Sequence, residues 1–265
     1  MAVLAVDSSS PAVKLSSYLG STPETQASNS FSPSSSTIIT VVSWAADSFD
    51  NDWNAAYPTI TDSLTSHLTW NPAEIEYSNS LSSTSARIGL WWASVGGTAP
   101  GSMTASVTEA ATGGQYIQGM AVSARVWDNA NASNPIGAVV AGTTSAATTT
   151  GTISITPTSV GSAIMMAASN VVGGPGTNTV GSGCYLCDNA GTATNTLGAG
   201  QLWVGTSSGP VLTTSLIAQS VSMTNTTSHI WTYLAYEVLP ASGGSPVTSV
   251  PVLLFQEALG RSSLW

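Results

Sequence analysis

Short apolar runs alternate with polar turn residues along most of this chain. From about residue 36 onward, runs rich in Val, Ile, Thr and aromatic residues are separated by clusters of Gly, Pro, Asn and Ser. Period-two alternation is typical of half-buried strands, and no segment combines helical periodicity with a capping box. The predicted strands cover 36–47, 57–63, 66–72, 86–94, 102–110, 119–129, 135–141, 151–159, 162–172, 182–189, 200–207, 213–224 and 229–240. The pattern predicts an all-β protein, an antiparallel jelly-roll β-sandwich with extended N- and C-terminal arms.

Changes in composition and in the hydrophobic pattern divide the chain into three parts. Residues 1–35 are rich in Ser, Thr and Pro and are expected to form an extended N-terminal arm. Residues 36–240 form the predicted sandwich, and 241–265 comprise a linker followed by an apolar C-terminal docking arm. An exposed apolar end is unfavourable in water, so we expect this arm to dock on protein. Its candidate docking residues are Leu253, Leu254, Phe255, Leu259, Leu264 and Trp265.

Two pairs of segments resemble each other within the chain. The run STIITVVSWAADS, which starts at residue 36, resembles SAIMMAASNVVGG, which starts at 162. The run ARIGLWWASVGG at 86–97 resembles GQLWVGTSSG at 200–209. We interpret the similarity as the sign of two packed sheets built from similar strands in one sandwich.

Trp91 and Trp92 are adjacent in a predicted strand, so their side chains point to opposite faces of a sheet. One ring is expected to enter the sandwich core. The other is expected to be covered by the edge of the second sheet, by an arm or by a neighbouring subunit. A buried ring of this size contributes about 2–3 kcal/mol from its area alone.

Charge is scarce in this chain. Charged residues make up 6% of the sequence, against roughly 25% in an average globular protein. The net charge is −9, and the basic residues are Lys14, Arg87, Arg125 and Arg261. Because phosphate contacts require Lys or Arg, nucleic acid and anionic membrane are poor candidates as partners. A surface with so few charges suits a protein that is desolvated in an assembly.

The order of segments from 36 to 240 resembles a jelly-roll domain of virion proteins from tailed phages, especially actinobacteriophages. The matching elements are STIITVVSWAADS, PTITDS, HLTW, RIGLWWASVGG, SMTASVTEA, ARVWDNANASNPIGA and WTYLAYEVLP. Asn or Ala replaces the Gly expected in the loop after ARVWD. These motifs are turns and strand ends, and they cover about three quarters of the chain.

The resemblance implies a non-enzymatic virion protein, either a capsid decoration protein or a minor tail protein. It would self-associate, as a trimer or ring, and bind the major capsid protein or tail proteins. The N-terminus MAVLAVDSSSPAVKL lacks the pattern of a signal peptide, so synthesis in the host cytoplasm is expected. No cofactor is implied.

A carbohydrate-binding or receptor-binding module is the alternative function, because jelly rolls also carry sugar sites. Its candidate stacking residues are Trp53, Tyr57 and Trp127. Asp47, Asp50 and Asp52 form a weak calcium candidate, since their loop lacks the spacing and Gly of a known calcium loop.

Catalytic chemistry finds little support in the sequence. No phosphate-binding loop, dinucleotide fingerprint or zinc-protease motif is present, and Glu237 has no evident second carboxylate for glycoside hydrolysis. Cys184 and Cys187 form a lone C-x-x-C, which we interpret as two small thiols on opposite faces of a strand, buried or half-buried.

Overall fold

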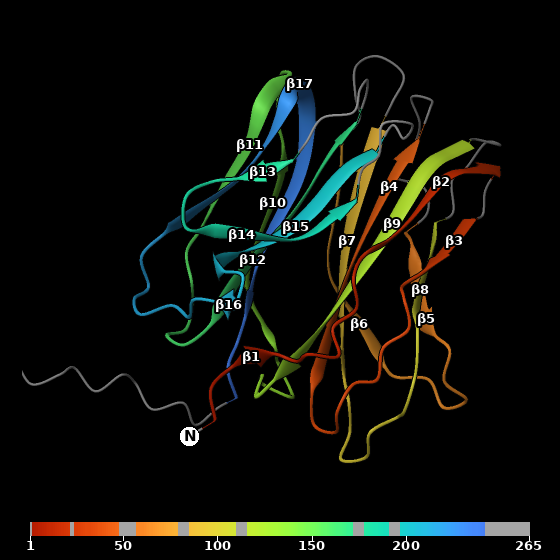
Figure 1. Cartoon of the computed structure of the whole chain (residues 1–265), viewed down its shortest axis with the longest axis vertical. Helices are drawn as coiled ribbons and strands as arrows, with labels where there is room; N and C mark the ends of the chain where they lie inside the picture. The colour runs from red at the N-terminus through yellow and green to blue at the C-terminus, as the bar shows by residue number, and fades with distance from the viewer. Residues whose placement is uncertain are drawn as a thin grey trace, which may run out of the picture.

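The computed structural model describes residues 2–21, 24–47, 57–78, 85–109, 116–171, 178–190 and 197–241. Every helix or strand within these ranges is a β-strand, and the paired strands run antiparallel (Figure 1). The prediction of an all-β, antiparallel sandwich is therefore confirmed. None of the described segments is a helix that could cross a bilayer.

The first half of the chain builds one main sheet and one small sheet. Its strands are β1 (Ala5–Val6), β2 (Lys14–Ser21), β3 (Glu24–Ala27), β4 (Ile38–Asp47), β5 (Thr59–Asp62), β6 (Trp70–Ser78), β7 (Ser85–Ser94), β8 (Ala105–Glu109) and β9 (Tyr116–Asp128). The main sheet has the order β9-β4-β7-β6, with β1 and β2 both paired to the outer edge of β9. The small sheet has the order β3-β8-β5.

The second half is built in the same way around one very long strand. Its strands are β10 (Ile136–Thr143), β11 (Thr148–Ile155), β12 (Ala163–Val171), β13 (Thr179–Val180), β14 (Cys184–Ala190), β15 (Leu197–Thr206), β16 (Gly209–Pro210) and β17 (Gln219–Val238). The main order is β10-β17-β12-β15-β14. The first part of β17, residues 219–224, pairs instead with β11 and β13.

The strand orders of the two halves correspond. The order β9-β4-β7-β6 in the first main sheet corresponds to β17-β12-β15-β14 in the second main sheet. The small sheet β3-β8-β5 corresponds to β11, the start of β17, and β13. Even a register shift recurs, between Pro72 and Glu74 in β6 and between Leu186 and Asp188 in β14. The similar segments in the sequence therefore belong to equivalent strands, β4 with β12 and β7 with β15.

The residue-by-residue alignment of those similar segments does not hold. It places Ile38 opposite Ile164, but Ile38 faces the core between the two main sheets and Ile164 faces the outer side of its own sheet. A shift of one residue along a strand moves a side chain to the other face. The sequence similarity thus identifies the strands correctly and their register incorrectly.

Three apolar layers hold the sheets together. The central layer lies between the two main sheets and includes Trp44, Trp127 and Tyr236. A second layer fills the space between the first main sheet and β3-β8-β5, and a third lies under β11 and the start of β17. Figure 1 shows the first-half strands, in red to yellow, beside the second-half strands, in green to blue.

The N-terminal region differs from the predicted arm. Residues 14–27 carry β2 and β3, which pair with β9 and β8, and both Leu4 and Phe31 are buried. The segment is extended, as expected, but it belongs to the sheets. Its polar sequences KLSSYLGS and ETQA belong to strands that pair on one side within the described chain, so little apolar alternation is needed.

The paired tryptophans occupy opposite faces of β7, as predicted. Trp91 is buried in the layer beneath the small sheet, whereas Trp92 on the other face is partly exposed. Trp127 is fully buried, and its indole N–H donates a hydrogen bond of 2.9 Å to Thr40. A ring with no exposed surface cannot stack on a sugar, so the glycan role suggested for Trp127 is wrong.

Candidate functional site

The sequence-predicted site residues do not gather at one place. Tyr57 is exposed at the start of β5. Trp53, Asp50, Asp52 and the side chain of Asp47 lie outside the described residues. The docking residues Leu253, Leu254, Phe255, Leu259, Leu264 and Trp265 also lie outside them. Within the described ranges, no group of three or more His, Cys, Asp or Glu side chains could hold a metal ion.

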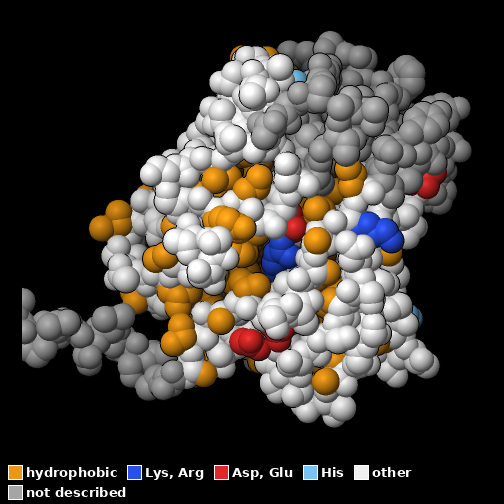
Figure 2. Space-filling model, viewed as in Figure 1, with side chains coloured by type: hydrophobic (Ala, Val, Ile, Leu, Met, Phe, Trp, Pro, Cys, Tyr) orange, Lys and Arg blue, Asp and Glu red, His pale blue; other side chains and the backbone are white. Residues whose placement is uncertain are grey.

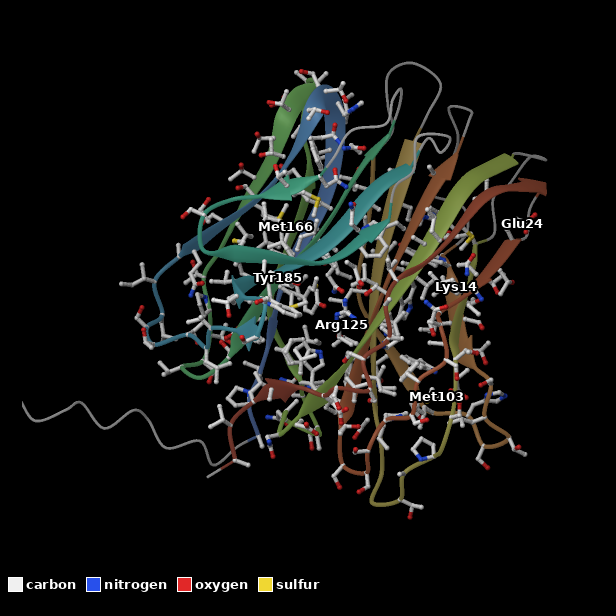
Figure 3. The ribbon with its side chains drawn as sticks, in the orientation of Figure 1. Lys14, Glu24, Met103, Arg125, Met166 and Tyr185 are labelled. Atoms are coloured by element: carbon white, nitrogen blue, oxygen red, sulfur yellow. The ribbon has the colours of Figure 1, made fainter. Side chains whose placement is uncertain are left out.

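A buried ion pair joins the two halves. Arg125 on β9 contacts the carboxylate of Asp188 on β14, and both side chains are at least 94% buried. Figure 3 shows Arg125 where the two halves meet, with Tyr185 of β14 nearby. The register shift in β14 explains the placement, because it turns both Cys187 and Asp188 away from the outer face that Leu186 occupies.

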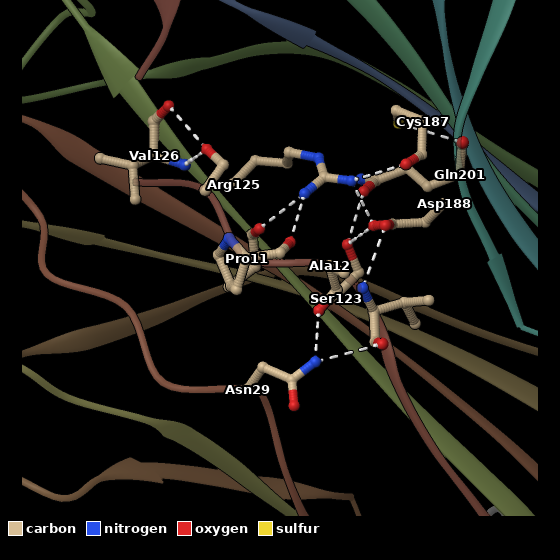
Figure 4. Close-up of polar contacts among 12 residues, drawn as sticks. Pro11, Ala12, Asn29, Ser123, Arg125, Val126, Cys187, Asp188 and Gln201 are labelled. Carbon is tan, nitrogen blue, oxygen red and sulfur yellow. Dashed lines mark hydrogen bonds and ion pairs between the residues drawn. The ribbon is translucent and has the colours of Figure 1, made fainter. Parts of the chain in front are cut away.

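Hydrogen bonds complete this polar cluster (Figure 4). The Arg125 guanidinium donates to the carbonyl of Pro11 at 2.7 Å and to the carbonyl of Cys187 at 3.2 Å. Asp188 accepts from the backbone N–H of Val13 at 3.1 Å and contacts the Ser123 hydroxyl. The cluster therefore ties the N-terminal segment, the first main sheet and the second main sheet to one another.

The electrostatics of the cluster favour a fixed ion pair. Burial opposes the charged form of Arg125, but the charge of Asp188 and the contacts with Asp188 and Cys187 together outweigh it and raise the pKa of the guanidinium above its ordinary value. Burial also raises the pKa of the Cys187 thiol to about 11, against the opposing charge of Arg125. A thiol with that pKa is protonated at neutral pH and is a poor nucleophile or metal ligand.

Both cysteines are free thiols and are partly buried, as the sequence predicted. Cys184 packs on the outer layer of the second half and Cys187 on the central layer, so they face opposite sides of β14.

A cleft of about 340 Å³ opens above the cluster. Its walls combine residues 6–12, Arg125, the β14 residues 185, 187 and 188, Trp203 and residues 207–209. Tyr185 and Trp203 stack there with ring centroids 5.4 Å apart. Figure 2 shows a hollow at this place, with basic atoms at its floor and hydrophobic side chains at its border. The floor groups Arg125 and Asp188 are bonded to each other and to the backbone, and the carboxylate of Asp7 also lines the cleft.

A larger open groove of about 600 Å³ lies between β5 and β6. We call it the aromatic groove; its main lining residues are Tyr57, Pro58, Ile60, Trp70, Pro72, Glu74 and Trp91. Tyr57 is 75% exposed. Within the described chain, β5 pairs only with β8 and β6 only with β7, so the groove separates two strand edges.

Asp62 sets the shape of the aromatic groove. This buried carboxylate accepts hydrogen bonds from the Trp70 indole N–H and the Leu68 N–H, each at 2.9 Å, and lies 3.0 Å from Nδ1 of His67. Burial alone would raise the pKa of Asp62, but the hydrogen bonds from Trp70 and His67 hold it below its ordinary value. The Asp and Trp of the motifs PTITDS and HLTW therefore act together to orient one wall of the groove.

The equivalent gap in the second half is closed. Asn178, just before β13, donates to the side chain of Asn189 on β14 at 3.0 Å and accepts from Asn225 at 3.0 Å. Asn178 and Asn225 are both buried. The two halves thus share a strand order but differ here, since polar side chains join the second pair of edges and the first pair borders a groove.

Two further buried carboxylates have structural partners. Glu109 pairs with Arg87 at 3.1 Å, and burial raises the pKa of Glu109 to about 7 although the charge of Arg87 opposes this. Glu237 accepts hydrogen bonds from the backbone N–H groups of Ala138, Thr158 and Ser159. Burial alone would raise the pKa of Glu237, but hydrogen bonding from the Ala138 N–H, from the Ser162 side chain and from the Thr158 hydroxyl and N–H lowers it.

The Arg125 cluster and the aromatic groove were not predicted from the sequence. Arg125 was noted only as one of four basic residues, and Asp188 follows the C-x-x-C without any motif of its own. Trp70 and Glu74 lay in or after a predicted strand with no sign that they border a groove. A basic residue inside a strand of this low-charge chain was the one available signal, because a buried cation requires an anionic partner.

Comparisons of this chain with models of known families, with curated proteins and with solved structures gave no match.

Proposed function

We propose that this chain is a non-enzymatic structural protein of a phage particle. It self-associates, as a trimer or ring, and attaches to the capsid or tail surface through the major capsid protein or tail proteins. It is made in the host cytoplasm and resides on the surface of the virion. The virion assignment is supported by the family resemblance of residues 36–240.

One structural observation supports a non-enzymatic role: the buried charged groups are bonded to one another or to the backbone. Arg125 and Asp188 are bonded to each other and to the backbone, and Arg87 pairs with Glu109. Glu237 is bonded to a loop of its own half. These groups join strands and halves into a rigid body, whereas a catalytic acid or base must be free to exchange a proton with a substrate.

The position of the chain on an intact particle tests this proposal. The gene would be tagged at the N-terminus in the phage genome that encodes it, and purified particles would be examined by mass spectrometry and cryo-electron microscopy. We expect stoichiometric, symmetric density on the capsid or tail. A chain that is abundant in the lysate and absent from particles would refute the proposal.

A carbohydrate-binding module is the second candidate, favoured by one observation. Tyr57, which is exposed, and Trp70, which is partly buried, lie on an open groove, and aromatic rings on such a groove can stack on sugars. Glycan-array binding by the full chain, lost in Tyr57→Ala and retained in Ile217→Ala, would support this function. Ile217 is a suitable control because it is 71% exposed and does not line the groove.

A further inference from the structure

The aromatic groove has the chemistry of a site for an apolar peptide. Its lining is mostly aromatic rings, prolines and isoleucines, with Thr59 and Glu74 as the polar contributors. A saccharide site would need several polar groups that converge on the sugar hydroxyls. The volume of about 600 Å³ is within the range of specific binding pockets, roughly 300–1,000 Å³.

Glu74 gives the groove a negative charge at its border. Its side chain accepts a hydrogen bond from the backbone N–H of Ile75, and none of the ion pairs in the described part of the chain includes it. Arg87 and Arg125 are both buried in ion pairs with other carboxylates. A partner for this groove should therefore be apolar and should carry a basic residue.

Residues 242–265 of the chain fit this description. They follow Ala241, whose N–H donates to the carbonyl of Asn129 at 2.7 Å, and they include six large apolar side chains and Arg261. Figure 1 shows the last described residues of the chain beside β1 and shows β5 on the opposite side of the molecule. The ten residues 242–251 span at most about 35 Å when fully extended, which lets the segment that follows them reach a neighbouring molecule.

We infer that the aromatic groove of one copy binds the C-terminal segment 252–265 of a second copy, with Arg261 of that segment paired to Glu74. This inference rests on the self-association in the proposed function and names its contact surface. The contact joins two different parts of the chain, so it can be exchanged reciprocally within a pair of copies or repeated around a ring.

Charge exchange tests the inference in the full-length protein. The association state would be measured by sedimentation equilibrium over a wide concentration range for the parent, Glu74→Arg, Arg261→Glu and the double variant. Each single variant is expected to weaken association at least about fivefold, and the double variant should recover most of that loss. Tyr57→Ala should weaken association by a similar factor, and Ile217→Ala should leave it unchanged.

A synthetic peptide of residues 252–265 provides an independent measurement. Added in excess to the full-length parent, it should dissociate the oligomer, and it should fail to do so with its Arg261 position changed to Glu. Circular dichroism of each variant confirms that the sheets are intact.

The outcomes separate this inference from the proposed function. If Glu74→Arg and Tyr57→Ala associate as strongly as the parent protein, the groove is not the contact surface. The proposed virion role is unaffected by that result. A parent that stays monomeric at every concentration overturns both the inference and the self-association in the proposal. If residues 252–265 are protected from solvent to the same extent at every protein concentration, the segment binds within its own molecule. That result would also overturn the inference.

Discussion

Gly137 lies directly against the carboxylate of Glu237, so that a β-carbon built at Gly137 would be 2.3 Å from Oε2. The adjacent Ala138 N–H donates to the same oxygen at 2.9 Å. Gly137 belongs to the Pro-x-Gly-Ala element of the sequence, and Glu237 belongs to the Glu-Val-x-Pro element near residue 240. The pairing shows that these motif residues have a structural task, which is to join β10, β17 and the loop after β11.

Gly137→Ala should therefore destabilise the protein. The added methyl group must displace the carboxylate or the backbone, and overpacking of this kind costs about 1–3 kcal/mol. The free energy of unfolding in urea measures the effect. Gly97→Ala is the matched control, since a β-carbon there would meet nothing within 4 Å, and its effect should be small.

Replacing Glu237 should weaken the fold in a pH-dependent manner. The folded-state pKa of Glu237 is lowered, so its stabilisation is present above the ordinary pKa of a glutamate and is lost as the pH falls through the folded-state value. Glu237→Gln removes the charge that the backbone N–H groups of Thr158 and Ser159 bind, at a cost of roughly 1–3 kcal/mol at pH 7. The unfolding free energy at pH 7 minus that at pH 3 should be smaller in the variant than in the parent, and an unchanged value of this difference would contradict the assignment.

Glu109 should give the opposite pH dependence. Its folded-state pKa is about 7, above the ordinary value of 4.5, so its contribution to stability is complete below pH 4.5 and declines as the pH rises to 7. Between pH 5 and 8 the parent should lose roughly 2–3 kcal/mol from this group. Glu109→Gln should remove that slope, whereas Glu24→Gln on the paired strand β3 should retain it. Thermal unfolding across this pH range provides the measurement.

Replacing one member of the Arg125–Asp188 pair should lower the free energy of unfolding more than replacing both members. Asp188→Asn leaves a buried guanidinium without its counter-charge, and the expected loss is about 3–5 kcal/mol. Arg125→Met should be comparably harmful, because it leaves Asp188 buried and unpaired. The double variant Arg125→Met with Asp188→Leu should recover a large part of the loss. A double-mutant cycle from urea unfolding would show no coupling if the pair were not formed.

The alternation of apolar and polar residues was enough to locate most strands from β4 onward. The alternation does not locate strands that are defined by their hydrogen-bonded partners and not by buried side chains. The sequences of β2 and β3 are polar and were assigned to an arm, although β9 and β8 pair with them. Residues 225–228, Asn-Thr-Thr-Ser, looked like a turn between two strands, yet β17 continues through them from Gln219 to Val238.

The candidate site was harder to predict than the fold, because it depends on packing between segments far apart in sequence. Arg125 and Asp188 meet only when the two main sheets pack face to face. Trp127 was proposed to face a ligand, but its position on β9 directs the ring into the central layer. Tyr57 was placed correctly as an exposed aromatic residue, and its neighbours Trp70 and Trp91 reach the same groove only through the folded sheets.

The repeated strand order has a consequence for assembly. Two copies of one arrangement, joined head to tail and packed through equivalent sheets, are the product expected when a shorter gene is duplicated and fused. A symmetric pair of unfused copies would offer two identical grooves, but here asparagines seal one gap and the other stays accessible. Within the described residues, the molecule therefore has an open groove in its first half and a closed gap at the equivalent place in its second half. If the groove of one copy binds the C-terminal segment of another, as we infer, two copies can exchange their segments reciprocally or several copies can join around a ring.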